Sequence, residues 1–92
     1  MKNKHHQLWL KARKEWIKQN PPNHQGQWYC VVGGGHLTKE SLTLDHDIPR
    51  SRDPSKRYDL TNLKPMCWYH NGDKGSKTLE QYLLTNPSKK CY

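Results

Sequence analysis

The chain has 92 residues, a mean hydropathy of −1.21 and a formal net charge of +8, from 16 Lys and Arg against 8 Asp and Glu. Such a length allows one small domain, and with 32% hydrophobic residues and no Phe the core is marginal, so a metal, disulfides or a partner is expected to stabilise it. The positive charge suits a polyanion, most commonly nucleic acid, although solubility alone would also account for it.

The cysteines and the N-terminal residues argue against a secreted or membrane protein. Cys30, Cys67 and Cys91 are too few for a disulfide framework. The segment 1–16 is charged throughout and lacks the apolar centre of a signal peptide, and no run approaches the ~20 apolar residues of a membrane span. We therefore expect an intracellular protein, in which reduced thiols more often bind metal.

The N-terminal segment is predicted to be helical over residues 3–19. Apolar residues recur at spacings of three and four from Leu8 to Trp16, and Pro21 ends the pattern. Lysines fill the remaining surface, so residues 1–20 form a basic amphipathic helix. Such a helix either covers the core or lies along a DNA backbone, and the sequence does not separate the two.

The central segment is predicted to contain two strands. Residues 28–32 are rich in aromatic and β-branched side chains, and three glycines at 33–35 begin a turn. A second strand is expected from residue 41 to about residue 46, before Pro49. A polar, arginine-rich loop follows.

Two helices are predicted in the last third of the chain. The first runs from Pro65, which suits a first helical turn, to a stop at Gly75, and the second covers residues 77–84. Residues 28–84 would then form the main domain, and residues 85–92 a flexible tail.

Cysteines and histidines offer a candidate zinc site. Cys67 and His70 are three residues apart and share a face of the predicted helix, so they can supply half of a tetrahedral site. Cys30, before the glycine turn, is the candidate third ligand, and His36, after it, the candidate fourth. The alternative is two buried thiols and two surface histidines.

The stretch "LDHDIPR" places Asp45 beside His46 at the predicted strand end. A carboxylate can ligate a divalent metal, and an imidazole can take a proton from water. Neighbours in a regular strand point to opposite faces, so both serve one site only where the strand bends or twists. Taken alone, the pair would more often be a surface feature.

Three blocks in order, "LDHDIPRSR", "DLTNLKPMC" and "CWYHNGDKG", resemble the HNH endonuclease family. The resemblance spans roughly residues 29–77. It implies an α+β fold, the small ββα-metal (His-Me finger) domain, here with an N-terminal helix and a zinc staple. It also implies metal-dependent hydrolysis of DNA phosphodiester bonds, by nicking or double-strand cleavage.

The resemblance implies a role for each matching residue. Asp45 is a ligand of the catalytic metal, His46 the general base, and Asn62 holds the base imidazole from the facing strand. Asn71 takes the second metal-ligand place, unless a shifted helix register puts His70 there. Lys74 matches the basic residue of the family and steadies the phosphate.

Cofactors and partners follow from the same resemblance. Mg²⁺ or Mn²⁺ would serve catalysis and Zn²⁺ the structural site, and DNA would be bound with little sequence preference. Freestanding nucleases this small resemble those of bacteriophages and mobile elements, which implies the bacterial cytoplasm and phage packaging or other mobile-element proteins as partners. The candidate DNA-backbone contacts are Arg50, Arg52, Arg57, Lys74 and Lys77.

Two other functions stay open at this point. The first is a zinc-stapled module of the same fold that binds DNA without cutting it. The second is an interaction module whose basic charge serves a protein partner. Asp45, His46, Asn62 and Asn71 favour the nuclease, because a module that only binds has no chemical need for this set.

Overall fold

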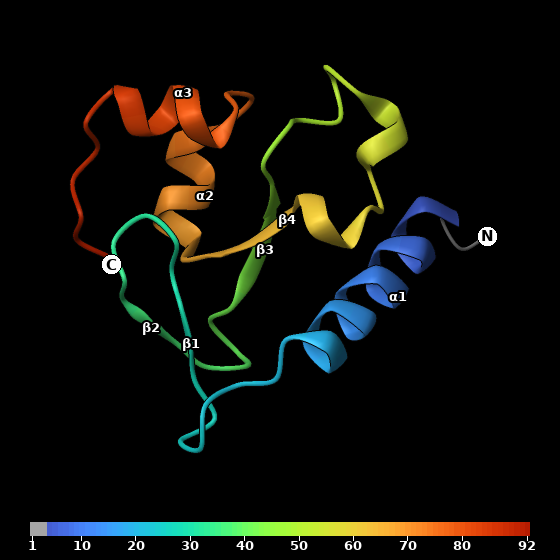
Figure 1. The fold of residues 1–92 in the computed structure, drawn as a ribbon, viewed down its shortest axis with the longest axis horizontal. Helices are drawn as coiled ribbons and strands as arrows, with labels where there is room; N and C mark the ends of the chain where they lie inside the picture. The colour runs from blue at the N-terminus through green and yellow to red at the C-terminus, as the bar shows by residue number, and fades with distance from the viewer. Residues whose placement is uncertain (1–3) are drawn as a thin grey trace.

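The computed structural model describes residues 4–92 and is a small α+β structure with an N-terminal helix and two small antiparallel sheets (Figure 1). In chain order its elements are helix α1 (Lys4–Gln19), strands β1 (Trp28–Tyr29), β2 (His36–Leu37) and β3 (Thr43–His46), 3-10 turns η1 (Pro54–Lys56) and η2 (Leu60–Asn62), strand β4 (Leu63–Met66), and helices α2 (Trp68–Lys74) and α3 (Leu79–Leu84).

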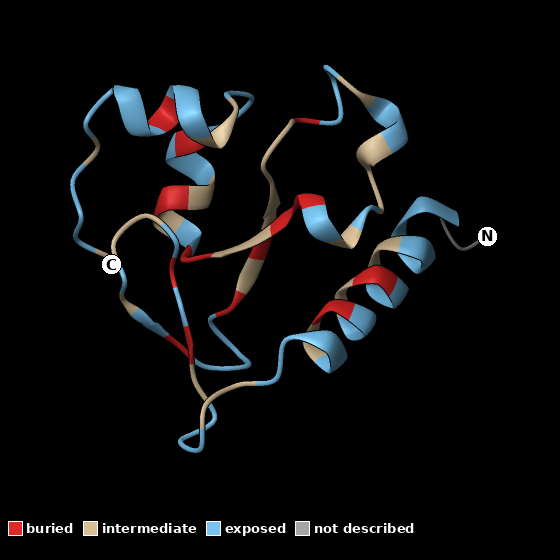
Figure 2. Cartoon of the chain, in the orientation of Figure 1, coloured by how far each residue is buried: buried red, intermediate tan, exposed pale blue. Residues whose placement is uncertain are grey.

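Helix α1 confirms the amphipathic pattern read from the sequence, over Lys4–Gln19, while residue 3 and the rest of the segment 1–3 lie outside the described residues. One stripe of the helix is buried, including Ala12 and Trp16, and the opposite face is exposed (Figure 2). The indole N–H of Trp16 donates to the Leu63 carbonyl at 3.2 Å, which joins α1 to the start of β4. The helix therefore covers the core.

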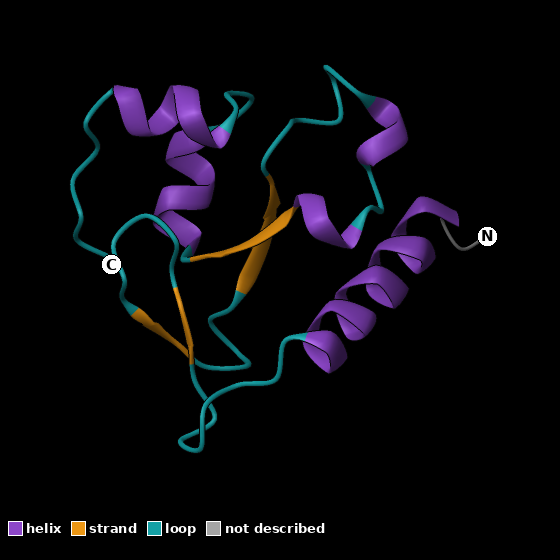
Figure 3. Cartoon of the chain, viewed as in Figure 1, coloured by secondary structure: helices purple, strands orange, loops and turns teal. Residues whose placement is uncertain are grey.

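Each sheet is a pair of antiparallel strands, named here the first hairpin (β1 and β2) and the second hairpin (β3 and β4), of which the second lies near the middle of the view (Figure 3). Strand β1 pairs with β2, and β3 pairs with β4 in a register that sets Asp45 opposite Lys64 and His46 opposite Leu63. The Val31 N–H donates to the Pro65 carbonyl at 3.0 Å and ties one hairpin to the other. The core between these elements is built from buried apolar side chains, among them Trp28, Leu37, Leu42, Leu44, Leu63 and Met66.

The segment before α2 differs from the prediction of a helix starting at Pro65. Residues Leu63–Met66 are extended as β4, and the helix begins at Trp68. Pairing with β3 satisfies the backbone of this segment and buries Leu63 and Met66, which outweighs the helix-start signal of a proline. The predicted stop at Gly75 is confirmed, with a φ of +57° that favours glycine.

The other predicted elements form with shorter bounds. Strand β1 ends at Tyr29 rather than at residue 32, and α3 begins at Leu79 because Thr78 caps it in a capping box with Gln81. In the described range 4–92, no helix combines the length and the apolar content needed to cross a membrane.

Candidate functional site

Asp45 and His46 end β3, where the strand gives way to the polar loop. One carboxylate oxygen of Asp45, Oδ1, accepts the backbone N–H of His46 at 2.8 Å. The other, Oδ2, has no hydrogen-bond partner and lies 3.2 Å from the ammonium of Lys74. The strand end thus presents a nearly buried carboxylate and an imidazole next to each other.

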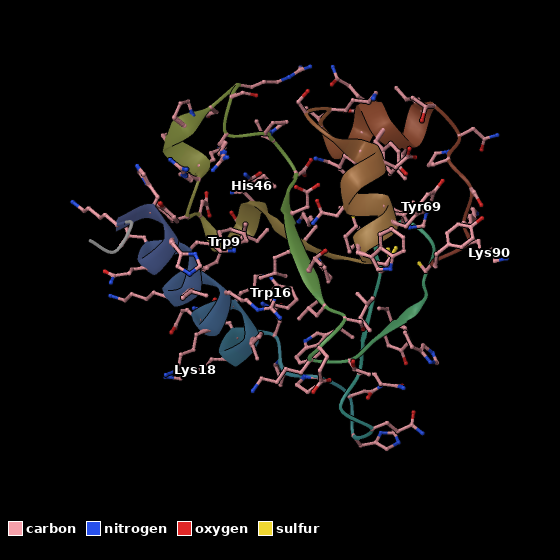
Figure 4. The ribbon with its side chains drawn as sticks, turned by 180° about the vertical axis from the view of Figure 1, so that it is seen from behind. Trp9, Trp16, Lys18, His46, Tyr69 and Lys90 are labelled. Atoms are coloured by element: carbon pink, nitrogen blue, oxygen red, sulfur yellow. The ribbon has the colours of Figure 1, made fainter. Side chains whose placement is uncertain are left out.

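The ring of His46 is held by a backbone carbonyl. Its Nε2 lies 2.8 Å from the carbonyl oxygen of Arg57, which can only accept, so Nε2 carries the hydrogen. In the neutral ring the unprotonated nitrogen is then Nδ1, which is the nitrogen able to take a proton. On one face the ring meets the indole of Trp9, with centroids 5.4 Å apart (Figure 4).

Asn62 is buried but does not bond the imidazole. Its side-chain oxygen accepts the N–H of Ile48, and its amide N–H groups donate to the carbonyls of Ile48 and Lys56, all within 3.3 Å. These bonds close the loop between β3 and η2 across its neck. The expected role is therefore corrected: Asn62 fixes the loop, and Arg57, the residue after Lys56, holds the ring.

Helix α2 packs on β3 through the side chain of Asn71. The Asn71 amide donates to the Thr43 hydroxyl at 2.9 Å, and that hydroxyl donates to the Met66 carbonyl at 2.7 Å. Because Thr43 and Asp45 are two residues apart on one strand, they lie on the same face of it. Asn71 therefore reaches the face of β3 that carries the Asp45 carboxylate.

Lys74 is fully buried, which corrects its predicted contact with phosphate. Its ammonium donates to the His46 carbonyl at 2.7 Å and lies 3.2 Å from Asp45. A charged lysine is rarely buried without a partner, and here the partner is the candidate catalytic carboxylate. Lys74 thus compensates the charge of Asp45 from inside the protein.

A pocket of about 450 Å³ opens beside this strand end, and we name it the Asp–His pocket. Its lining combines residues of α1, β3 and the loop, including His5, His6, Trp9, Asp45, His46, Arg50, Arg57 and Tyr58. Of the predicted DNA contacts, Arg50 and Arg57 line it, whereas Arg52 and Lys77 are exposed and do not. No motif in the sequence indicated that α1 would form one wall of the pocket.

A second site gathers Cys30, Cys67, His70 and Cys91, named here the Cys3His cluster, whose ligand atoms all lie within 4.8 Å of one another. The three sulfur atoms lie 3.5, 3.1 and 3.6 Å from Nδ1 of His70. Tetrahedral zinc with bonds of about 2.3 Å to sulfur and 2.0 Å to nitrogen separates such atoms by roughly 3.5 Å. The cluster could therefore hold a zinc ion.

Local structure orients each ligand of the cluster. Cys67 caps α2 and His70 follows one turn later, which brings the two predicted partners to one face. The Nε2–H of His70 donates to the Ser88 carbonyl at 2.6 Å and so leaves Nδ1 for a metal. The same bond holds His70 in the cluster. The alternative helix register, which would place His70 at the Asp45 site, is therefore not observed.

The fourth position belongs to Cys91, which corrects the prediction of His36. The His36 ring lies edge-on to Tyr29, with centroids 5.0 Å apart, on the exposed side of β2. A Cβ added to Gly35 would lie 2.8 Å from the Cys91 sulfur, so the glycine turn makes room for the returning chain. The predicted flexible tail, residues 85–92, is instead packed back onto the cluster, beside the labelled Tyr69 in Figure 4.

Two thiols of the cluster have pKa values shifted in opposite directions. Burial opposes the ionisation of Cys30, but N–H groups of Gly33, Cys67 and Val32 donate to its sulfur and lower its pKa to about 7. Burial, with hydrogen bonds to the other two thiols, raises the pKa of Cys91 to about 12. Crowded thiols do not ionise together unless a cation joins them, and a zinc ion would supply that charge.

Comparison of the whole chain with known proteins found no matching family model, no matching curated protein and no matching solved structure.

Proposed function

We propose that this protein is a metal-dependent DNA endonuclease of the HNH kind, with a ββα-metal domain formed by β3, β4 and α2. The observation that carries the proposal is the shared strand end: a carboxylate, Asp45, and an imidazole, His46, adjoin one pocket while α2 reaches over the same strand with Asn71. The Asn71 amide comes from a separate block of sequence, and a carboxylate, an imidazole and an amide are groups that metal-assisted hydrolysis of a phosphodiester can use.

His46 is the proposed general base. A neutral imidazole with its hydrogen on Nε2 can accept a proton from water at Nδ1, and the Arg57 carbonyl is well placed to stabilise the resulting imidazolium. General-base assistance of this kind contributes typically ~10²–10⁴-fold to the rate. The closed neck at Asn62 keeps that carbonyl in position.

Asp45 and Asn71 are the proposed ligands of a divalent cation beside His46. The Asp45 Oδ2 has no hydrogen bond, and the bond that Asn71 makes uses its amide nitrogen rather than its oxygen. Carboxylate and amide oxygens are the ligands that Mg²⁺ and Mn²⁺ prefer, so these two residues would hold the ion. When bound, it would supply positive charge for the phosphate and the leaving oxygen. Lys74 moderates the negative charge of the site.

Zinc is the proposed ion of the Cys3His cluster, with a structural role. Four protein ligands close a tetrahedral site and leave no position for water or substrate. The ligands come from three separate parts of the chain, so the ion would join the first hairpin, α2 and the C-terminal segment. This staple compensates for a small core.

DNA is the proposed substrate because the chain has a net positive charge and places two arginines at the Asp–His pocket. The chain carries +8, and Arg50 and Arg57 line the Asp–His pocket, where they can contact phosphates next to the one being cut. Such contacts are insensitive to base sequence, so binding should weaken steeply with salt.

The test is cleavage of supercoiled plasmid by purified protein with Mg²⁺ or Mn²⁺. We expect nicked or linear product with metal, none with EDTA, and near-complete loss in His46→Ala. His24→Ala is the matched control, because His24 is exposed in a turn and does not line the Asp–His pocket. Intact plasmid with every metal, together with a shift in gel mobility, would instead support the non-catalytic DNA-binding module.

A further inference from the structure

Trp9 connects helix α1 to the candidate base. Its indole faces the His46 ring at a centroid distance of 5.4 Å, with the ring planes 36° apart (Figure 4). The indole is half-buried and packs against the core, so its position is set by the fold rather than by solvent. Helix α1 lies outside the HNH-like blocks, so no motif covers this contact.

A second connection runs from α1 to the loop. Nδ1 of His5 and the Tyr58 hydroxyl lie 2.7 Å apart, and the two rings stack at 6.3 Å. Tyr58 directly follows Arg57, whose carbonyl accepts the Nε2–H of His46. The helix therefore contacts the imidazole directly through Trp9, and it also contacts Tyr58, the neighbour of the residue that bonds Nε2.

We propose that α1 is part of the catalytic apparatus and that Trp9 is a positioning residue for His46, an inference that rests on the proposed nuclease function. A single hydrogen bond at Nε2 leaves an imidazole free to tilt about the bond axis. An aromatic face against the ring removes that freedom, so the Arg57 carbonyl and the indole together hold Nδ1 in one orientation. Catalytic groups need such support because small displacements cost rate.

The kinetic test compares three variants in the plasmid assay. Trp9→Leu keeps an apolar side chain but removes the ring face, Trp9→Phe retains a ring, and Trp68→Leu removes an indole that is 62% exposed on α2. We expect Trp9→Leu to lower kcat roughly tenfold or more while KM for DNA changes less than about twofold. Trp9→Phe should recover most of the loss, and Trp68→Leu should match the wild type.

A second readout does not depend on activity. Long-range ¹⁵N–¹H NMR distinguishes the two tautomers of a neutral imidazole, and His46→Ala identifies the His46 signal. We expect the Nε2–H tautomer alone in the wild type and a mixture of both in Trp9→Leu. Circular dichroism and zinc content establish that each variant is folded, and Trp9→Met replaces Trp9→Leu if the latter unfolds.

Three results would overturn the inference: wild-type kcat in folded Trp9→Leu, a loss confined to KM, or a His46 tautomer that the substitution leaves unchanged. Failure of the nuclease proposal looks different, because the wild type would then cut no DNA with any metal. In that case the tautomer comparison still decides whether Trp9 positions the ring.

Discussion

Replacing Cys91 by serine tests the Cys3His cluster at its least expected ligand. Cys91 is the one ligand supplied by the C-terminal segment, and its sulfur lies 3.6 Å from Nδ1 of His70. Structural zinc binds small domains with roughly 10–16 kcal/mol at neutral pH, so an equal share for each of four ligands is about 3 kcal/mol. At 1.4 kcal/mol for each tenfold change, we expect zinc affinity to fall roughly a hundredfold.

Two measurements check this expectation. Competition with a chromogenic chelator gives the change in zinc affinity directly. Cobalt substitution counts thiolates, because charge-transfer absorption arises from each cobalt–sulfur bond, and going from three thiolates to two should remove about a third of it. His36→Ala is the matched control, since His36 lies outside the cluster and should leave both readouts unchanged.

Two results would contradict the assignment of Cys91 as the fourth ligand. In the first, Cys91→Ser binds zinc as tightly as the wild type and keeps its full thiolate absorption. In the second, His36→Ala weakens binding as much as Cys91→Ser does. The first result would exclude Cys91 as a ligand, and the second would show that His36 on β2 contributes to zinc binding as much as Cys91 does.

Three further predictions concern the surroundings of the two sites. Gly35→Ala would set a Cβ 2.8 Å from the Cys91 sulfur, so we expect the tail ligand to be displaced and the zinc to be lost to a chelator sooner. Lys74→Met leaves the Asp45 carboxylate without its ion-pair partner; removing one partner of a buried pair costs about 3–5 kcal/mol, so urea unfolding should show a loss of ~3 kcal/mol, partly recovered when Asp45→Asn is added. In metal-free, reduced protein, folding lowers the pKa of Cys30 from 9.0 to about 7. The Cys30 thiolate therefore stabilises the folded state fully above pH 9, and this contribution is lost as the pH falls through 7. The pKa of Cys91 is raised to about 12, so its contribution is present below pH 9 and is lost toward pH 12; urea titrations should therefore find metal-free stability rising from pH 7 to a maximum near pH 9.

The local sequence pattern was sufficient to predict helix α1 and the end of strand β3. The apolar stripe of α1 reports its buried face directly, and β3 ends at His46 as the alternation and Pro49 predict. Cys67 and His70 meet because a spacing of three within one helix fixes their separation. In each case the interacting residues lie within one element.

Features that depend on contacts between distant segments could not be predicted from the local sequence pattern. Pro65 carries a helix-start signal, but pairing with β3 decides its conformation. Cys91 is twenty-one residues beyond His70, and the only signal for it was a third cysteine without an assigned partner. Trp9 reads as a core residue, and only the fold shows that its ring meets His46.

If the Cys3His cluster binds zinc, folding would depend on the concentration of free zinc. An ion that joins residues 30, 67, 70 and 91 would bind the folded chain far better than an unfolded one, so the population of folded molecules would follow that concentration. Above the dissociation constant, each tenfold increase in free zinc would add about 1.4 kcal/mol to the free energy of unfolding. Removal of zinc would then destabilise the fold and, with it, the Asp–His pocket.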